Sequence, residues 1–379
     1  MNFHETIEKA MAAPRALNED ELALLLSPGD EADRRMLHDA AYGVKLRHCG
    51  AKVSVRGLIE IGNVCAKDCH YCGIRKSNRK VARYALPVPE VIDLARTGLE
   101  CGYASLVLQS GEIESPAHTA YISECLSGIL ALDGKLRPSR EDPVGITLSL
   151  GEQVEDVYRR WREDGAARYL LRIETSNPKL YQSLHPAGHS FERRVECLRA
   201  LRRCNYQVGT GVMIGLPGQT VRDLARDILF FAEIDADMIG MGPYIPHRDT
   251  PLGAASGLFS VARSCAGSPA ERLRLGIDMI AATRLHLHDV NIAATTALQA
   301  LAPDGREQGL LAGANVIMPN VTDVRYRRNY QLYEGKPNLD ENAAETRLAL
   351  ERSIASIGET INYGHRGDSP HYTRQNSGK

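Results

Sequence analysis

The stretch VSVRGLIEIGNVCAKDCHYCG, residues 53–73, decides the fold of this chain of 379 residues. Its first part, residues 53–61, is a short apolar run of the kind that forms a buried strand. Directly after it, Cys65, Cys69 and Cys72 are crowded into a few residues. The sequence therefore predicts a loop at the carboxyl end of a strand that holds three thiols close together.

Further short apolar runs follow the first, and longer segments with a helical pattern separate them: residues 104–108, 145–149, 168–172, 207–214, 237–241, 290–294 and 314–318. Strands that alternate with helices indicate βαβ units and a parallel sheet. With the first run, eight such units predict an α/β fold, a closed (β/α)8 barrel, with an open doubly wound sheet as the alternative. The chemistry of such a barrel lies at the carboxyl ends of its strands. Polar clusters fall there, at residues 63–72, 109–112, 172–174 and 295–296.

We expect the barrel to occupy residues 51–335. Residues 1–50 form a helical extension in which Asn18 caps a helix over 19–26, and residues 27–30 break the chain before an amphipathic helix over 31–48. Residues 336–379 form a polar segment, with a helix between 342 and 361 followed by a frayed tail.

Composition and charge narrow the class of protein. Hydrophobic residues make up 43% and charged residues 25% of the chain, which excludes disordered and coiled-coil classes. A net charge of −1 creates no overall electrostatic field that would attract nucleic acid or an anionic membrane, so any basic site must be local. We find neither a signal peptide nor an apolar run long enough for a membrane helix. We therefore expect a cytoplasmic protein that binds neither nucleic acid nor membranes.

The cysteine pattern indicates a metal centre. Nine cysteines are too few and too odd in number for a disulfide scaffold. Three thiolates on one loop can surround a corner of an iron–sulfur cube and leave one iron free to bind a small molecule. Structural zinc is the alternative, but it needs four ligands, and His70 is poorly placed to be the fourth.

The spacing Cys-x-x-x-Cys-x-aromatic-Cys, with Tyr71 at the aromatic position, resembles the signature of radical S-adenosylmethionine (SAM) enzymes. The resemblance implies one 4Fe-4S cluster held by Cys65, Cys69 and Cys72. It also implies that SAM chelates the free iron and is cleaved by an electron from the cluster to a 5′-deoxyadenosyl radical.

Further stretches resemble the HydE family of FeFe-hydrogenase maturases, in the biotin synthase-like branch of that superfamily. They are LVLQSGE (106–112), ITLSLGE (146–152), RYLLRIETSNP (168–178), GLPGQT (215–220), GPYIPHRDTPL (242–252), ATTA (294–297), GANVIMPN (313–320) and YQLYEGK (330–336). A biotin synthase-type or methylornithine synthase-type enzyme acting on an organic carboxylate is the alternative. Neither is expected to supply GANVIMPN and the downstream YQLY together.

The resemblance assigns SAM-binding roles to residues at matching positions: Tyr71, Gln109, Ser110, Thr147, Glu174, Arg194, Met238 and Tyr330. It also places Tyr330 with the three cysteines among the catalytic positions. The chemistry of these residues agrees with the roles. Glu174 can accept from the ammonium of SAM, Arg194 can pair with its carboxylate, and the thioether of Met238 can pack on adenine.

A second group of residues is expected to hold substrate. Arg56 lies in the middle of a predicted strand, where an unpaired buried charge would cost several kcal/mol. In HydE-like proteins the positions of Arg56, Arg172, Thr295 and Thr296 line a cavity that binds anionic groups. Alternatively, Arg56 pairs with Glu60 or another carboxylate.

By resemblance, the substrate is a small organometallic iron complex that carries cysteine, carbonyl and cyanide ligands. The expected partners are an electron donor and the other hydrogenase maturation proteins. Some members of the family carry a second cysteine triplet near the C-terminus, but here the last cysteine is Cys265. We therefore expect no accessory cluster.

Overall fold

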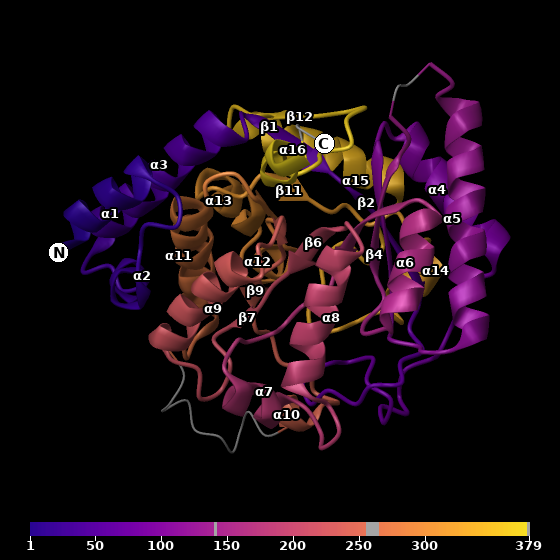
Figure 1. Cartoon of the computed structure of the whole chain (residues 1–379), viewed down its shortest axis with the longest axis horizontal. Coiled ribbons are helices and arrows are strands. Elements are labelled where there is room, and N and C mark those ends of the chain that lie inside the picture. The colour runs from indigo at the N-terminus through magenta and orange to yellow at the C-terminus, as the bar shows by residue number, and fades with distance from the viewer. Residues whose placement is uncertain (140–141, 255–264, 377–379) are drawn as a thin grey trace.

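The computed structural model describes residues 1–139, 142–254 and 265–376 (Figure 1). Three helices come first: α1 (Phe3–Ala12), α2 (Glu19–Leu25) and α3 (Glu31–His48). Asn18 caps α2, because its side chain accepts from the backbone N–H of Glu21 while the Glu21 carboxylate accepts from the N–H of Asn18. α2 and α3 lie where the sequence predicts them, and α1 lies within the predicted helical extension.

Parallel strands form the centre of the molecule. Seven of them are neighbours in one sheet, in the order β10-β8-β6-β5-β4-β3-β2. Their bounds are β2 (Gly57–Gly62), β3 (Ser105–Ser110), β4 (Gly145–Ser149), β5 (Ala166–Leu170), β6 (Gln207–Thr210), β8 (Met238–Ile239) and β10 (Asn291–Ile292). Most of their residues are buried, as expected for strands covered on both faces.

The strand β11 (Val316–Ile317) closes the sheet into a barrel. On one side the N–H of Ala294 donates to the carbonyl of Val316 at 2.9 Å. On the other, the N–H of Leu58 donates to the carbonyl of Pro319 at 2.8 Å. The predicted (β/α)8 barrel is confirmed, and the open doubly wound sheet is wrong.

Short strands extend the barrel at both ends. β1 (Lys52–Val55) precedes β2 and lies between β11 and β12 (Thr360–Ile361). At the other end, β7 (Met213–Ile214) pairs with β9 (Gly242–Pro243). The single apolar run predicted at 53–61 is therefore two strands, which separate at Arg56.

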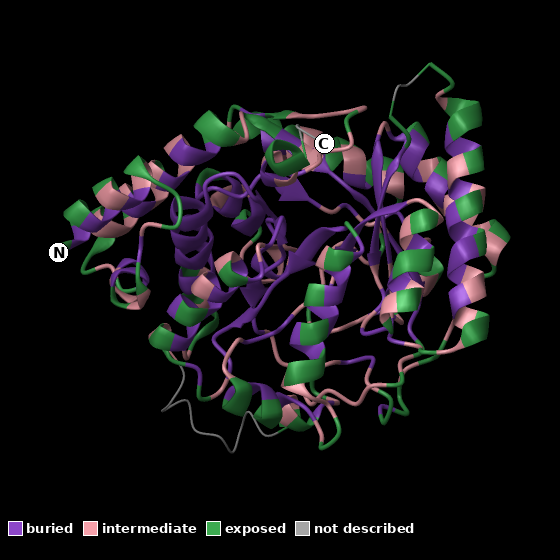
Figure 2. Ribbon diagram, viewed as in Figure 1, coloured by how far each residue is buried: buried purple, intermediate pink, exposed green. Residues whose placement is uncertain are grey.

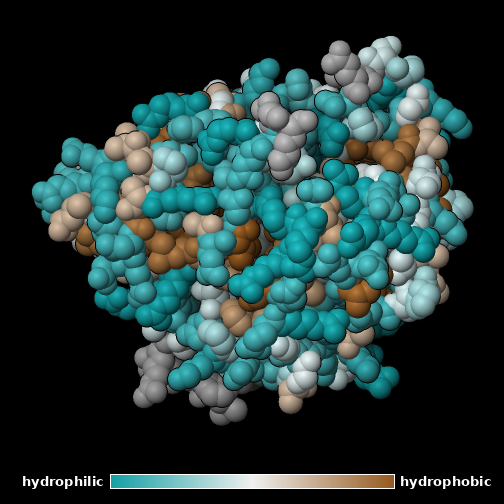
Figure 3. All heavy atoms as spheres, viewed as in Figure 1, coloured by the Kyte–Doolittle hydropathy of each residue, from teal (hydrophilic) through white to brown (hydrophobic). Residues whose placement is uncertain are grey.

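Helices surround the barrel (Figure 1): α4 (Val88–Glu100), α5 (Pro116–Leu136), α6 (Glu155–Glu163), α7 (Pro178–Leu184), α8 (Phe191–Arg203), α9 (Val221–Glu233), α10 (Pro251–Ala254), α11 (Pro269–Leu287), α12 (Thr296–Leu301), α13 (Gly305–Leu311), α14 (Val324–Arg327), α15 (Ala343–Ser356) and α16 (Pro370–Asn376). Figure 2 shows buried residues on the strands and on the inward faces of these helices. Hydrophilic side chains cover most of the face seen in Figure 3. In the part of the chain that the structure describes, none of the helices has the length and apolar character needed to cross a membrane.

The two ends of the barrel carry different segments. In Figure 1 the loop between β2 and α4 runs along the lower edge, whereas β12 and α16 lie at the top. The tail is not frayed over its described residues, because it binds polar groups at the amino ends of the strands. Asn291 Nδ2 donates to the carbonyl of Gly367 at 3.0 Å, and Gln207 Oε1 accepts from the N–H of Ser369 at 3.0 Å. The last residues of the predicted frayed tail, 377–379, lie outside the described residues.

Candidate functional site

The three cysteines lie on the loop that follows β2. Two backbone N–H groups, of Lys67 and Glu112, donate to Cys65 Sγ at 3.4 and 3.3 Å. Gly111 lets this loop approach β3, because a Cβ at Gly111 would lie 2.3 Å from the carbonyl oxygen of Val64. The small residue in Ser-Gly-Glu therefore packs the cysteine loop against the barrel.

The thiols open into a cavity of about 320 Å³ at the carboxyl ends of the strands. Many of the residues predicted to bind SAM or substrate line this cavity with the cysteines: Tyr71, Gln109, Ser110, Arg172, Glu174, Arg194, Thr295, Thr296 and Tyr330. These positions are spread over the sequence from β2 to the segment after α14. The barrel brings them to one site, as the pattern of polar residues after strands predicts.

Glu174 presents a buried carboxylate to the cavity. Its Oε2 lies 3.1 Å from Arg172 Nη2, but the two groups are not aligned for a hydrogen bond, so Oε2 has no hydrogen-bond partner among the described residues. Leaving a buried acceptor unpaired costs about 1 to 3 kcal/mol. The site is therefore suited to a ligand that donates a hydrogen bond to Glu174.

Arg194 reaches the cavity from the helix α8 and not from the end of a strand. Its Nε donates to Glu152 Oε1 at 2.7 Å, and its Nη1 donates to the carbonyl of Arg172 at 2.5 Å. Lys67 Nζ lies 3.0 Å from Glu152 and 3.1 Å from Glu112. These charges form one buried network beside the cysteines.

The charges of the network shift the pKa values of its two carboxylates, Glu112 and Glu152, in opposite directions. Burial raises the pKa of Glu112, and the neighbouring Glu152 raises it further. Burial also acts to raise the pKa of Glu152, but Arg194 and Lys67 outweigh it and hold that pKa below its usual value. Sequence reasoning missed Glu152, although it ends the quoted stretch ITLSLGE in the same way that Glu112 ends LVLQSGE.

Tyr330 lies against the cysteine loop because the segment YQLY is hydrogen-bonded to it. The N–H of Gly73 donates to the carbonyl of Leu332 at 3.0 Å, and Lys336 Nζ donates to the carbonyl of Tyr330 at 3.0 Å. Burial raises the pKa of Tyr330 well above its ordinary value, although its contact with the Gln109 side chain acts the other way. The phenol is therefore neutral and available as a hydrogen-bond donor.

Thr147 and Met238 are not brought to this cavity. They line a smaller cavity of about 20 Å³ deeper in the barrel, together with Arg56. Leu170, Gly240 and Met318 line both cavities, so the two are neighbours.

Arg56 is only partly paired in the deeper cavity. It donates to Met238 Sδ at 2.8 Å and to the carbonyl of Gly367 at 3.2 Å, and its Nε has no hydrogen-bond partner among the described residues. Pairing with Glu60 is wrong, because Glu60 binds Lys336 and Asn320 instead. Burial lowers the pKa of Arg56 well below its usual value, and the nearby Arg168 lowers it further. This guanidinium is therefore poorly compensated by the protein.

The other predicted substrate residues face the larger cavity. Arg172 Nη2 donates to the carbonyl of Val212 at 2.9 Å, and its Nε has no hydrogen-bond partner within the described ranges. Thr295 Oγ1 donates to the carbonyl of Met241 at 3.1 Å. Thr296 Oγ1 accepts from Arg306 Nη2 at 2.8 Å, a buried arginine that the sequence analysis did not single out.

The donor set fits an iron–sulfur cluster better than structural zinc. Burial raises the pKa of Cys69 to about 12 and that of Cys72 well above its ordinary value, and a bound metal cation of either kind would favour their thiolates. His70 is not part of any group of three possible ligands whose atoms lie within 4.8 Å of one another among the described residues. The ligand atoms of His185 and His189 do lie within 4.8 Å of that of Cys69, but neither Cys65 nor Cys72 belongs to that group.

Comparisons with known proteins agree with this geometry. Residues 59–231 match the Radical SAM superfamily. The chain is 41% identical over 336 residues to the FeFe hydrogenase maturase subunit HydE of Thermotoga maritima, and the match covers 89% of each protein. It is 23% identical over 362 residues to a biotin synthase of Rhodococcus jostii, covering 93% of this chain and 96% of the relative.

Two solved structures share the fold. Methylornithine synthase superimposes with a TM-score of 0.77 at 21% identity, covering 94% of this chain and 97% of its own. The FeFe-hydrogenase maturase HydG from Carboxydothermus hydrogenoformans superimposes with a TM-score of 0.75 at 18% identity, covering 95% of this chain and 79% of its own.

Proposed function

This chain belongs to the HydE family of radical SAM enzymes, and from that premise we propose that it acts on a small organometallic iron complex. It is a radical SAM enzyme of FeFe-hydrogenase maturation, with a 4Fe-4S cluster and SAM as cofactors. The alternative, an enzyme of the biotin synthase or methylornithine synthase type, is less supported, because identity falls from 41% to 28% or less.

Cys65, Cys69 and Cys72 are the residues that would hold the cluster. When bound, the cluster supplies the electron that cleaves SAM to a 5′-deoxyadenosyl radical. The backbone N–H groups of Lys67 and Glu112 stabilise negative charge on Cys65 Sγ. The cysteine-free tail supports a single cluster.

We assign the amino-acid end of SAM to Glu174 and Arg194. Glu174 Oε2, which has no hydrogen-bond partner among the described residues, accepts from the ammonium. Arg194 pairs with the carboxylate while Glu152 holds its guanidinium in place. Tyr71, Gln109, Ser110 and Tyr330 line the same cavity and complete the binding site.

We assign Thr147 and Met238, which line the deeper cavity, to the substrate. Thr147 and Met238 lie beside Arg56, and Thr147 Oγ1 has no hydrogen-bond partner among the described residues. Their position supports contact with the substrate more than with SAM.

The observation that carries the substrate proposal is that two arginines beside the cavities keep a donor without an acceptor, although Arg172 also pairs with Glu174. Arg56 and Arg172 each keep a buried Nε without a hydrogen-bond partner among the described residues, and they line neighbouring cavities below the cysteines. An iron complex with cyanide and carboxylate groups would supply the missing acceptors. Thr295 and Thr296 add hydroxyl groups to the same wall.

We place this reaction in the cytoplasm, with the other hydrogenase maturation proteins as partners. No two cysteines of the described residues are joined in a disulfide, which suits a reducing compartment.

The test compares wild-type and Arg56→Leu protein, both reconstituted without oxygen. Wild type should contain about four iron and four sulfide per chain, cleave SAM and mature hydrogenase. Arg56→Leu should keep the cluster and the cleavage of SAM but lose at least tenfold in maturation, because Leu cannot pair with a bound anion.

Arg168→Leu is the matched control, because Arg168 also binds the tail but does not line either cavity. A folded Arg56→Leu protein that matures hydrogenase at the wild-type rate would overturn the substrate proposal. An equal loss in Arg168→Leu would show that the tail contact, not the cavity, matters. Melting curves of all three proteins accompany the assay.

A further inference from the structure

The segment that follows the cysteines is strongly basic. Residues 74–83 contain Arg75, Lys76, Arg79, Lys80 and Arg83 and no acidic residue, although the whole chain has a net charge of −1. A concentration of one charge in a nearly neutral protein gives a local field that can steer a partner of opposite charge.

This basic segment covers the cysteine loop directly. The N–H of Lys76 donates to the carbonyl of Lys67 at 2.8 Å, and Arg75 Nη2 lies 2.7 Å from Asp68 Oδ2. Arg83 Nη1 donates to the carbonyls of Asn63 and Ile74 at 2.6 and 2.7 Å. Arg75 and Arg83 therefore hold the two loops together.

Other cations of the segment are available to a partner. Lys76 and Arg79 are exposed, and neither forms an ion pair with any residue in the ranges 1–139, 142–254 and 265–376. The Lys80 side chain is 76% exposed, although it pairs with Asp249.

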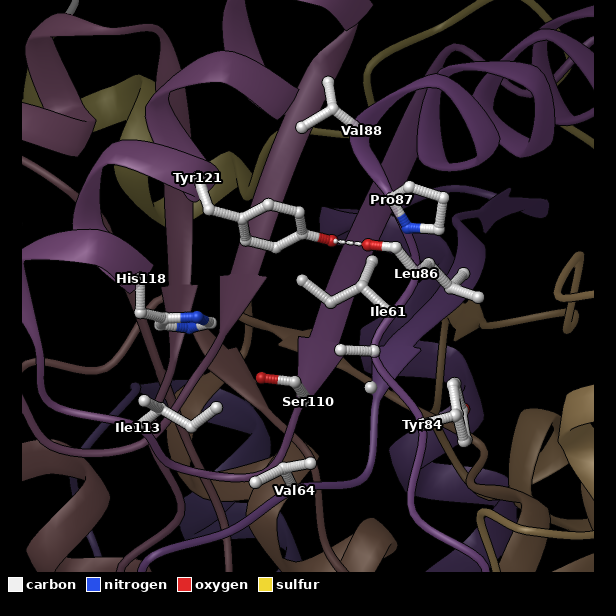
Figure 4. A pocket seen from close by; sticks show the side chains of 12 residues that line it. Ile61, Val64, Tyr84, Leu86, Pro87, Val88, Ser110, Ile113, His118 and Tyr121 are labelled. Carbon is white, nitrogen blue, oxygen red and sulfur yellow. Dashed lines mark hydrogen bonds between the residues drawn. The ribbon is translucent and has the colours of Figure 1, made fainter.

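An apolar pocket of about 350 Å³ lies next along the chain, at Tyr84 and the residues after it (Figure 4). Tyr84, which follows Arg83, lines this pocket together with Val64, the residue before Cys65. Val64 is 41% exposed. Ile113, Pro87 and His118 form other walls of the pocket (Figure 4).

We propose that the basic segment 74–83 and this apolar pocket together form the docking surface for an acidic one-electron carrier protein. An apolar centre with a charged rim is the usual composition of a protein interface. The charge of segment 74–83 favours a negative partner. Its position favours one that delivers electrons, because electron transfer weakens steeply with distance and this segment covers the cysteine loop. This inference rests on the proposed function, in which the cluster must be reduced.

The step is a simple electron transfer. The reduced carrier loses one electron, the cluster held by Cys65, Cys69 and Cys72 gains it, and no atom is transferred. Complementary charge should act mainly on the rate of association and on the dependence on salt.

The experiment uses the reconstituted enzyme and a reduced flavodoxin, a small acidic carrier, as the probe. Lys76→Glu/Arg79→Glu should weaken flavodoxin binding and flavodoxin-driven SAM cleavage by at least about fivefold at low salt. Cleavage driven by dithionite, which needs no docking surface, should stay at the wild-type rate. Higher salt should weaken flavodoxin binding to wild type and reduce the difference.

The matched control is Arg96→Glu/Lys135→Glu, which makes the same change of charge on exposed residues of α4 and α5. Unchanged flavodoxin affinity in the loop variant, or an equal loss in the control, would overturn the docking surface. The absence of dithionite-driven cleavage in wild type would instead overturn the proposed function. Because flavodoxin binding is measured separately, the docking proposal is tested in either case.

Discussion

Glu174 combines two features that are costly in a folded protein. Its backbone has a φ of 66°, in the left-handed region that residues other than glycine rarely adopt, and its Oε2 is buried without a hydrogen-bond partner among the described residues. Strain of this kind, of order 1 to 3 kcal/mol, tends to persist where a ligand makes use of it. The strained backbone directs the carboxylate into the cavity with the three cysteines.

We expect Glu174→Gln to weaken SAM binding by about 10- to 150-fold, because it replaces a charge-assisted hydrogen bond worth about 1.5 to 3 kcal/mol. Binding of SAM to the reconstituted variant measures the loss, and the iron content should stay at the wild-type value. Glu114→Gln, at an exposed acid that pairs with Arg193, is the control. SAM affinity equal to wild type in Glu174→Gln would reject the assignment.

The sequence does not predict which distant charged residues form pairs, such as Arg194 with Glu152. The two lie 42 positions apart, and neither segment carries a pattern that shows which charges meet. The cysteines could be predicted because their chemistry is local. Partners such as Lys67 and Glu112 become visible only when the barrel brings separate strands together.

At the scale of the elements, the pattern of apolar residues is enough to predict an element that buries its own apolar side chains. The eight strands of the barrel, β2, β3, β4, β5, β6, β8, β10 and β11, lie where short apolar runs predict them, because each run is buried between the barrel interior and the helices. The tail was missed for the opposite reason. It is polar, and it binds through groups far away in the sequence, such as Asp368 with Arg168, 200 positions apart.

The tail also carries a titratable anchor. His371 Nε2 lies 2.9 Å from Asp235 Oδ1, and its Nδ1 lies 3.2 Å from Asp289 Oδ1. Burial acts to lower the pKa of His371, but the hydrogen bonds to Asp235 and Asp289 outweigh it and raise the pKa to about 9. The charged imidazolium therefore ties α16 to the ends of two barrel segments.

This pKa predicts how stability depends on pH. A group whose pKa is raised on folding stabilises fully below its unfolded pKa, about 6.5, and loses that contribution as pH rises through the folded value. The free energy of unfolding of wild type relative to His371→Gln should therefore fall between pH 6.5 and about 9. Chemical unfolding of both proteins at several pH values measures the difference. A difference that does not change with pH would show that His371 is not charged in the folded protein.

At the scale of the whole molecule, the two ends of the chain meet around the barrel. β12, near the C-terminus, pairs in parallel with β1, which follows the N-terminal helices. Lys45 on α3 donates to Glu359 Oε1 at 2.6 Å and to the carbonyl of Leu310 on α13 at 3.1 Å. Both charged side chains are 0% exposed. This ion pair therefore joins the N-terminal helices, the barrel and the C-terminal segment.

Removing one charge of the Lys45–Glu359 pair should lower the free energy of unfolding strongly, whereas replacing both residues should not. Lys45→Met leaves the Glu359 carboxylate buried without its cation, so we expect a loss of about 3 to 5 kcal/mol in the free energy of unfolding. In Lys45→Met/Glu359→Leu both charges are gone, and most of that loss should be recovered, because apolar residues of similar size can fill a site that an ion pair occupied. Chemical unfolding of the reconstituted proteins measures both values. If Lys45→Met is as stable as wild type, the ion pair does not join the two ends of the chain. If the double variant is as unstable as the single one, packing and not charge determines the stability at this position.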